Sequence, residues 1–285
     1  MSSEKRADIP DDEVQLAPPL NRRSRLNKRW GETVDTNFTD LICLLLCLNT
    51  GLCDSCAFNA WSCFLAMQTG KMPALQISRS MMIKLTIPGN TIVLGLGASH
   101  QPLGAPNGWA RSIVSIAAFV IGAMTFARCT KALGARRRGT LFLSFCFQAL
   151  LIIIAAVLIQ TDVVQTQSGR QFTLDRPLLT LVPIALLAFQ SAGSINSTRM
   201  LGFNEIPGVV LTSVYYDIAS DAGLFDGISQ NAKRNRRIGG VVMLLTGAIV
   251  GGWLSRTEGG MALVLWLAAA LKFCAGVGWL FWTPA

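Results

Sequence analysis

Residues 41–67 read LICLLLCLNTGLCDSCAFNAWSCFLAM, an apolar run that contains a single charged residue, Asp54. At 1.5 Å per residue, a helix of this length exceeds the roughly 30 Å of hydrocarbon in a bilayer. The whole chain has the same character, since 51% of its 285 residues are hydrophobic and 14% are charged. In soluble proteins roughly a quarter of all residues are charged, so the sequence predicts an integral membrane protein.

Eight apolar segments define the expected architecture. Six are long enough to span the bilayer, and two are too short and are interrupted by Gly or Pro, which is typical of re-entrant segments or half-helices. The sequence therefore predicts an all-α, polytopic transmembrane helix bundle. The six spans are expected at 41–67, 109–127, 140–160, 178–197, 238–254 and 261–282, and the two short segments at 90–99 and 206–218.

The basic residues predict the orientation of the chain. The net charge is +9, but basic residues are not interleaved with aromatic ones, so we expect no nucleic-acid partner. With a cytosolic N-terminus and six spans, the clusters around Arg128 and Lys233 both fall on the cytosolic side, as the positive-inside rule requires. Both termini are then cytosolic and the bilayer is the main partner. The alternative is a seven-span protein in which one short segment crosses fully.

Two further features concern organisation. Residues 1–39 are polar and contain Pro10, Pro18 and Pro19, so we expect a disordered cytosolic tail before a single transmembrane domain at 40–285. Within that domain each half reads span, short segment, span, span, and the halves begin on opposite sides of the membrane. This order is that of an inverted repeat, although short polar and apolar patterns also recur by chance.

Two stretches resemble a known family. Residues 50–70 read TGLCDSCAFNAWSCFLAMQTG and residues 90–102 read NTIVLGLGASHQP. They are similar to the signature TGLxDxxxFNAWxCFxxMQTGNTxxLGLG of fungal-type members of the YoaK family, the domain of unknown function numbered 1275. The similarity extends over nearly everything after residue 40. It implies a multi-pass membrane protein without supplying a substrate.

The chain departs from this signature at one place. The family motif MQTGNT is continuous, whereas here residues 71–89, KMPALQISRSMMIKLTIPG, separate Gly70 from Asn90. The residues GKM at 70–72 can be encoded by GGTAAGATG, which contains a typical 5′ splice-site sequence, and an insertion of whole codons keeps the reading frame. We hypothesise that 71–89 is a translated intron. The alternative is a genuine loop, because lengthening a loop costs little entropy.

Charges inside the apolar blocks mark the candidate site, since burying a charge in a membrane costs several kcal/mol unless it has a function or a partner. Asp54 lies in the middle of the first block and Lys272 at the centre of the last. One hypothesis is that Asp54, paired with Lys272, couples solute movement to protons or ions. The other is that the two form an ion pair that orients helices. The remaining candidate pathway residues are polar: Asn59, Gln68, Thr69, Asn90, Thr91, Gln190, Thr212, Ser213 and Asp217.

Motifs for enzymes are largely missing from the sequence. There is one histidine, His100, and there is no HExxH, GxSxG or Walker sequence. We expect no catalytic residue, metal or cofactor. The leading hypothesis is a secondary transporter or permease for a small polar solute, and the alternative is a membrane scaffold that binds partners without transporting anything.

Overall fold

The computed structural model describes residues 30–66, 68, 71–74, 85–98, 108–164, 177–206 and 211–284. Six helical segments in these ranges are long and apolar enough to cross a membrane, which confirms the prediction of six spans. They are α2 (Thr39–Trp61), α4 (Gly108–Leu133), α5 (Arg138–Gln160), η1 (Pro177–Thr180) with α6 (Leu181–Leu201), α8 (Ala232–Leu254) and α9 (Gly260–Phe281).

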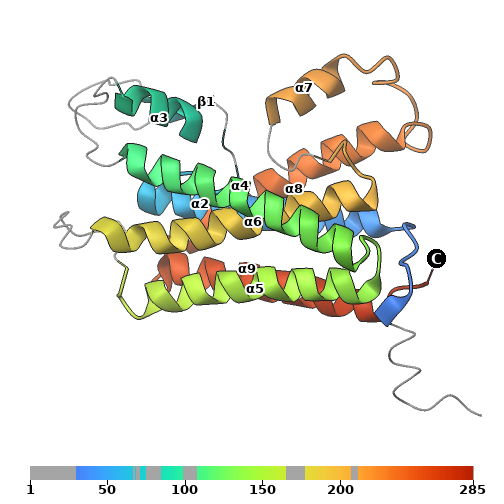
Figure 1. The fold of residues 1–285 in the computed structure, drawn as a ribbon. Coiled ribbons are helices and arrows are strands. Elements are labelled where there is room, and N and C mark those ends of the chain that lie inside the picture. Colours follow the sequence, from blue (N-terminus) through green and yellow to red (C-terminus); the bar gives the residue numbers. More distant parts are fainter. Residues whose placement is uncertain are drawn as a thin grey trace, which may run out of the picture.

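The two short segments form short helices, α3 (Asn90–Ala98) and α7 (Leu211–Ala219), of nine residues each. A helix of nine residues rises only about 14 Å, so neither spans the hydrocarbon. Figure 1 shows α3 above one end of the bundle and α7 above the other. Helix α3 packs against α4, and α7 packs against α8.

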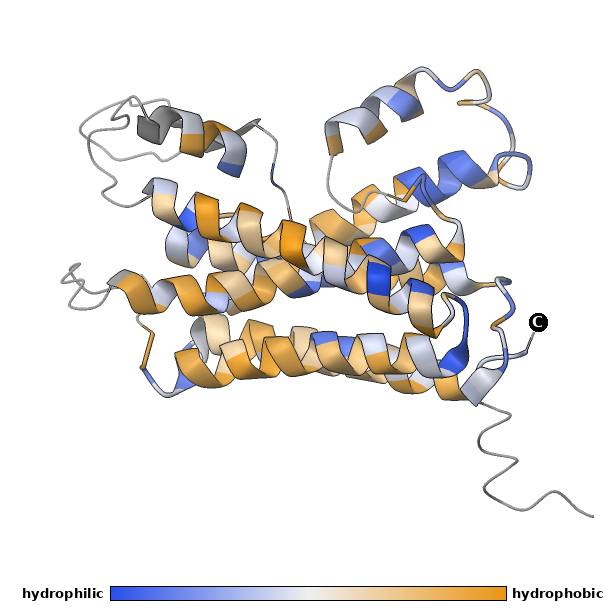
Figure 2. Cartoon of the chain, in the orientation of Figure 1, coloured by the Kyte–Doolittle hydropathy of each residue, from blue (hydrophilic) through white to orange (hydrophobic). Residues whose placement is uncertain are grey.

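The outer faces of the bundle are apolar. Figure 2 shows hydrophobic residues along the spans and hydrophilic residues concentrated at the end where the C-terminus lies. Large apolar side chains are exposed on several helices, among them Ile121 and Met124 on α4 and Val242 and Ile249 on α8. In water such a surface would drive aggregation, whereas in a bilayer it contacts lipid tails.

Both ends of the described chain lie at one end of the bundle, which we call the basic end. Val34 forms a β-bridge with Pro284 and is buried, and Thr33 forms another with Arg137. The tail expected over residues 1–39 is therefore packed from Thr33 onward, because the bundle offers Val34 an apolar surface. Residues 1–29 lie outside the described part of the chain. The clusters around Arg128 and Lys233 lie at the same end, the first in the last turns of α4 and just after it, and the second in the first turns of α8.

Three helix pairs build the bundle: α2 on α8, α4 on α6, and α5 on α9. The first pair is unusually close, because glycines replace side chains at the contact. A Cβ atom built on Gly247 would lie 2.1 Å from the carbonyl oxygen of Leu48, and one built on Gly51 would lie 2.1 Å from that of Leu244. The backbones of α2 and α8 therefore touch directly, as small-residue contacts in membranes allow.

The helix contacts have the symmetry of an inverted repeat. Exchanging α2, α3, α4 and α5 for α6, α7, α8 and α9 converts the α2–α8 contact into the α6–α4 contact and leaves the α5–α9 contact unchanged. The same exchange converts the α5–α6 contact into the α9–α2 contact, and the α3–α4 contact into the α7–α8 contact. Successive spans alternate in direction, so each helix runs opposite to its counterpart. The fold is thus the inverted arrangement that the order of segments predicts.

The two halves of the repeat differ in the length of one connection, and the difference corresponds to the segment 71–89. Between the end of α2 and the start of α3 lie residues 62–89, and between the end of α6 and the start of α7 lie residues 202–210. The first connection has 28 residues and the second has 9, and the difference of 19 is the length of 71–89. The described residues of this segment form β1 (Lys71–Ala74) and β2 (Leu85–Pro88), an antiparallel pair in which Lys71 lies opposite Pro88. The extra residues therefore leave and return at neighbouring positions.

Candidate functional site

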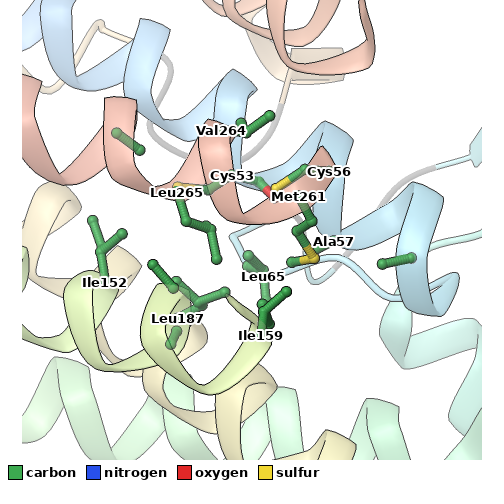
Figure 3. Packing of buried hydrophobic residues seen from close by; sticks show 14 of the residues in the cluster. Cys53, Cys56, Ala57, Leu65, Ile152, Ile159, Leu187, Met261, Val264 and Leu265 are labelled. Carbon is green, nitrogen blue, oxygen red and sulfur yellow. Dashed lines mark hydrogen bonds between the residues drawn. The ribbon is translucent and has the colours of Figure 1, made fainter. Parts of the chain in front are cut away.

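Helix α2 ends earlier than the apolar run predicts. Ser62 adopts a left-handed conformation (φ 52°, ψ 37°), and residues 63–66 are not helical. The prediction that the span reaches residue 67 is therefore wrong. After Ser62 the chain leaves the helix, and the side chains from Cys63 to Ala66 are buried. We call residues 62–66 the first hook; Figure 3 shows its Leu65 beside Ile159 and Leu187, in the core formed by several spans.

A non-helical backbone within a membrane protein needs other partners for its amide and carbonyl groups. Asp54, on the preceding helix, supplies one acceptor for two of them. Its Oδ1 accepts hydrogen bonds from the backbone amides of Leu65 (2.9 Å) and Ala66 (3.0 Å). Asn90, at the start of α3, accepts a bond from the amide of Phe64 through Oδ1 (3.2 Å) and donates through Nδ2 to the carbonyl of Phe64 (2.6 Å).

The remaining carbonyl bonds of the hook come from hydroxyl and amide groups. Ser115 on α4 donates to the Phe64 carbonyl (2.8 Å), and Ser191 on α6 donates to the Leu65 carbonyl (3.1 Å). Gln68 also donates to the Leu65 carbonyl (3.0 Å). Side chains from α4 and α6 therefore hold the hook against the bundle, in addition to those of Asp54 and Asn90.

The predicted residues Gln68, Asn90 and Thr91 lie together although 71–89 separates them in sequence. Asn90 donates to Gln68 Oε1 (2.9 Å). The hydroxyl and the backbone amide of Thr91 both donate to the Gln68 carbonyl, at 2.9 and 3.1 Å. Thr69, the fourth predicted residue of this group, lies outside the described residues. The β1–β2 hairpin thus begins and ends beside a polar cluster of Gln68, Asn90 and Thr91, and none of these three residues belongs to the hairpin.

Lys272 forms a second buried network. It lies in the middle of α9 with 1% of its surface exposed. Its Nζ donates to Gln190 Oε1 and to Ser194 Oγ (2.8 Å), both on α6, and Ser194 donates to Gln148 Oε1 on α5 (3.4 Å). These partners are neutral, and in the described chain no ion pair of Lys272 is observed. A buried cation is therefore held by hydrogen-bond acceptors alone.

Helix α6 connects the two networks, because Ser191 bonds the first hook whereas Gln190 and Ser194 bond Lys272. Asp54 is engaged with backbone amides of the hook, which favours a positioning role for this carboxylate. Lys272 bonds side chains of a neighbouring helix. The sequence identifies both residues but assigns the leading role to Asp54, because it cannot show which groups each side chain meets.

Four predicted pathway residues lie away from these networks. Asn59 is exposed and donates to Ser255 Oγ (3.1 Å) at the end of α8. Thr212 and Ser213 occupy the exposed face of α7. Asp217 forms an ion pair with Arg237 (3.7 Å) and is 47% exposed, so it belongs to the surface of the basic end.

Two residues of the networks, Ser115 and Gln148, escape prediction from sequence, whereas Ser191 and Ser194 belong to the polar run that also contains the predicted Gln190, at the end of the fourth apolar block. Serines in helices often bond a carbonyl of their own helix, so Ser115 is not distinctive. Gln148 could have been found from sequence, because an amide side chain in the middle of a strongly apolar span indicates a polar partner. In the structure Gln148 is fully buried.

Because the polar cluster forms without residues 71–89, we predict that these residues can be deleted with little loss of stability. A variant that lacks them joins Gly70 to Asn90, and we expect it to fold with an unfolding temperature within about 3 °C of the full chain, since surface loops contribute little. Deleting 71–90 instead also removes Asn90 and should lower the unfolding temperature markedly. Thermal unfolding in detergent micelles measures both. Equal damage by the two deletions would show that the hairpin supports the fold.

Residues 42–278 match the family described as "Protein of unknown function (DUF1275)". The match runs from the start of α2 to the end of α9 and so includes both hydrogen-bond networks. No curated protein and no solved structure matches the chain. Because the family match covers most of the sequence and all six spans, the chain belongs to the DUF1275 family.

Proposed function

We propose that this chain is a secondary transporter for a small polar solute. The observation that carries the proposal is the inverted repeat, with the buried cation Lys272 near the middle of a span. Secondary transporters built from inverted repeats bind their solutes near the bilayer midplane, beside helices that are interrupted. The end of α2 at Trp61, followed by the first hook, is an interruption of this kind.

In this proposal Lys272 is the solute-binding or coupling residue, and Asp54 positions the first hook. Charged residues within transmembrane helices are costly and tend to mark solute or ion pathways. A solute with an oxygen acceptor would replace Gln190 or Ser194 as a partner of the Lys272 ammonium group. The basic end of the bundle faces the cytosol, in accordance with the positive-inside rule.

Flux into proteoliposomes tests the proposal. Purified protein is reconstituted into liposomes, and radiolabelled amino acids, carboxylates and polyols are added outside in turn, so that solute uptake is measured whether or not it is coupled to protons. We expect flux of at least one class, loss of that flux in Lys272→Met, and normal flux in Lys131→Met, which removes an exposed lysine. Methionine keeps the length of the side chain and removes the buried charge, although Gln190 and Ser194 lose the hydrogen bonds from Lys272.

The unfolding temperature of Lys272→Met serves as the control for folding. Flux that persists in this variant would remove Lys272 from the mechanism. A folded wild-type protein that moves none of the three solute classes would contradict the transporter proposal and favour the membrane scaffold.

A further inference from the structure

The connection after α6 repeats the first hook at the other end of the bundle. Helix α6 ends at Gly202, which is left-handed (φ 95°), just as α2 ends at the left-handed Ser62. We call residues 202–206 the second hook. Its Phe203 and Ile206 are buried, at the positions that match the buried Cys63 and Ala66 of the first hook. The two hooks lie at opposite ends because α2 and α6 run in opposite directions.

An arginine at the start of the next span bonds the residue directly before the first hook. Arg111 is in the first turn of α4, and its Nη1 donates to the carbonyl of Trp61 (2.8 Å), the last residue of α2. This bond ties the beginning of α4 to the point where the chain leaves its helix. The basic side chain is partly buried there and caps an otherwise free helix end.

A second arginine, at the matching position of α8, bonds the second hook directly through a side chain. Arg236, in the second turn of α8, forms ion pairs with Glu205 of the hook (3.1 Å) and with Asp40 at the start of α2 (3.2 Å). Its guanidinium also lies 4.7 Å from the centre of the Phe203 ring. The separation in sequence between Arg111 and Arg236 equals that between Gly122 and Gly247, the glycines at which α4 and α8 touch the backbones of α6 and α2.

We infer that Arg111 and Arg236 are the two latches of the transport cycle, each closing one end of the bundle over the buried site by fastening a hook. Alternating access requires one end to open while the other stays closed, and the inverted repeat supplies one latched hook at each end. Both sets of contacts are formed in this structure, so by this inference both ends of the bundle are closed. The inference deepens the proposed function by naming the residues that control access.

Native cysteines report the opening of each hook. Cys63 lies in the first hook and is 1% exposed, and Cys43 is 0% exposed and belongs to the same apolar cluster as Phe203 and Ile206. The experiment treats proteoliposomes with a sulfonated maleimide on both sides of the membrane. Mass spectrometry of peptides then identifies the modified cysteine. Cys129, which is exposed, is replaced by serine in every variant.

We expect Arg111→Ala to raise labelling of Cys63 at least tenfold and to leave Cys43 unchanged. Arg236→Ala should do the reverse, and Glu205→Gln, which weakens only the hook side of the second latch, should act in the same direction as Arg236→Ala. Arg256→Ala and Arg128→Ala remove an exposed arginine at each end and should change neither cysteine. Only variants that elute as a single symmetrical peak in size-exclusion chromatography are compared, and Arg111→Lys and Arg236→Lys replace an alanine variant that does not.

If the maleimide labels both Cys63 and Cys43 in either the Arg111 or the Arg236 variant, the bundle has loosened as a whole, and the inference is overturned. An unchanged pattern in both latch variants would overturn it as well. Labelling needs no solute, so its outcome is independent of the flux assay. End-specific opening in a protein without flux would contradict the transporter alone, whereas flux with unselective labelling would contradict the latches alone.

Discussion

Replacing Asp54 with alanine is expected to cost about 2–6 kcal/mol of the free energy of unfolding, because two buried amide groups lose their acceptor and each orphaned group costs about 1–3 kcal/mol. These are the amides of Leu65 and Ala66 in the first hook. Since a typical domain is stable by only about 5–15 kcal/mol, the loss is a large share of the total. Thermal unfolding in detergent micelles measures it.

Two further variants test whether Asp54 positions the first hook or acts as a coupling carboxylate. Asp54→Asn keeps a side-chain oxygen at the position of the acceptor, so it should be clearly more stable than the alanine variant. Asn59→Ala, a little over one turn further along α2, removes one partly buried hydrogen bond of a side chain that is itself exposed, and it should have a smaller effect. If Asp54→Ala unfolds like the wild type but abolishes flux, the carboxylate is a coupling residue, as the sequence alone suggests, and the positioning role is wrong.

Replacing Gly247 with alanine is expected to separate α2 from α8. The added Cβ would lie 2.1 Å from the carbonyl oxygen of Leu48, which is a backbone atom and cannot rotate away. Overpacking a core typically costs about 1–3 kcal/mol, and we expect the upper end of that range or more because two backbones must move. The same helix pair carries Gly51, so its alanine variant should behave alike.

Gly252 is the matched control for this prediction. It lies on the same helix as Gly247, but nothing approaches its Cβ position within 4 Å. Exchange of glycine for alanine in a helix is favourable by about 0.8–1.0 kcal/mol when space allows. Gly252→Ala should therefore unfold at or above the wild-type temperature. Equal unfolding temperatures for the two variants would mean that α2 and α8 can part without loss.

The sequence predicts the spans well because hydrocarbon thickness dictates their length and composition. It misses the end of α2 because residues 62–67, SCFLAM, are as apolar as the helix before them. The break becomes visible only through its partners, and besides Asp54 these include Asn90, Ser115 and Ser191, which lie outside the first span. No local pattern in the first span signals bonds to residues so far along the chain.

The symmetry of the halves is equally hard to see in the residues themselves. Both hooks begin with a left-handed residue and bury their second and fifth residues, yet the buried Phe64 and Leu65 of the first correspond to the exposed Asn204 and the partly buried Glu205 of the second. A repeat of this kind is preserved in the lengths and contacts of helices. The order of long and short apolar segments therefore predicts the inverted repeat, whereas its matching positions require the structure.

The bonds of the first hook also determine when it can form during biosynthesis. Ser191 lies 126 residues after Leu65, so at synthesis rates of about 5–20 residues per second the carbonyl of Leu65 precedes this partner by on the order of ten seconds. Helix α2 can enter the membrane alone, but its hook then lacks the donors that α4 and α6 bring. The insertion machinery or water must solvate this segment meanwhile, and the first part of the chain to enter the bilayer is among the last to reach its final structure.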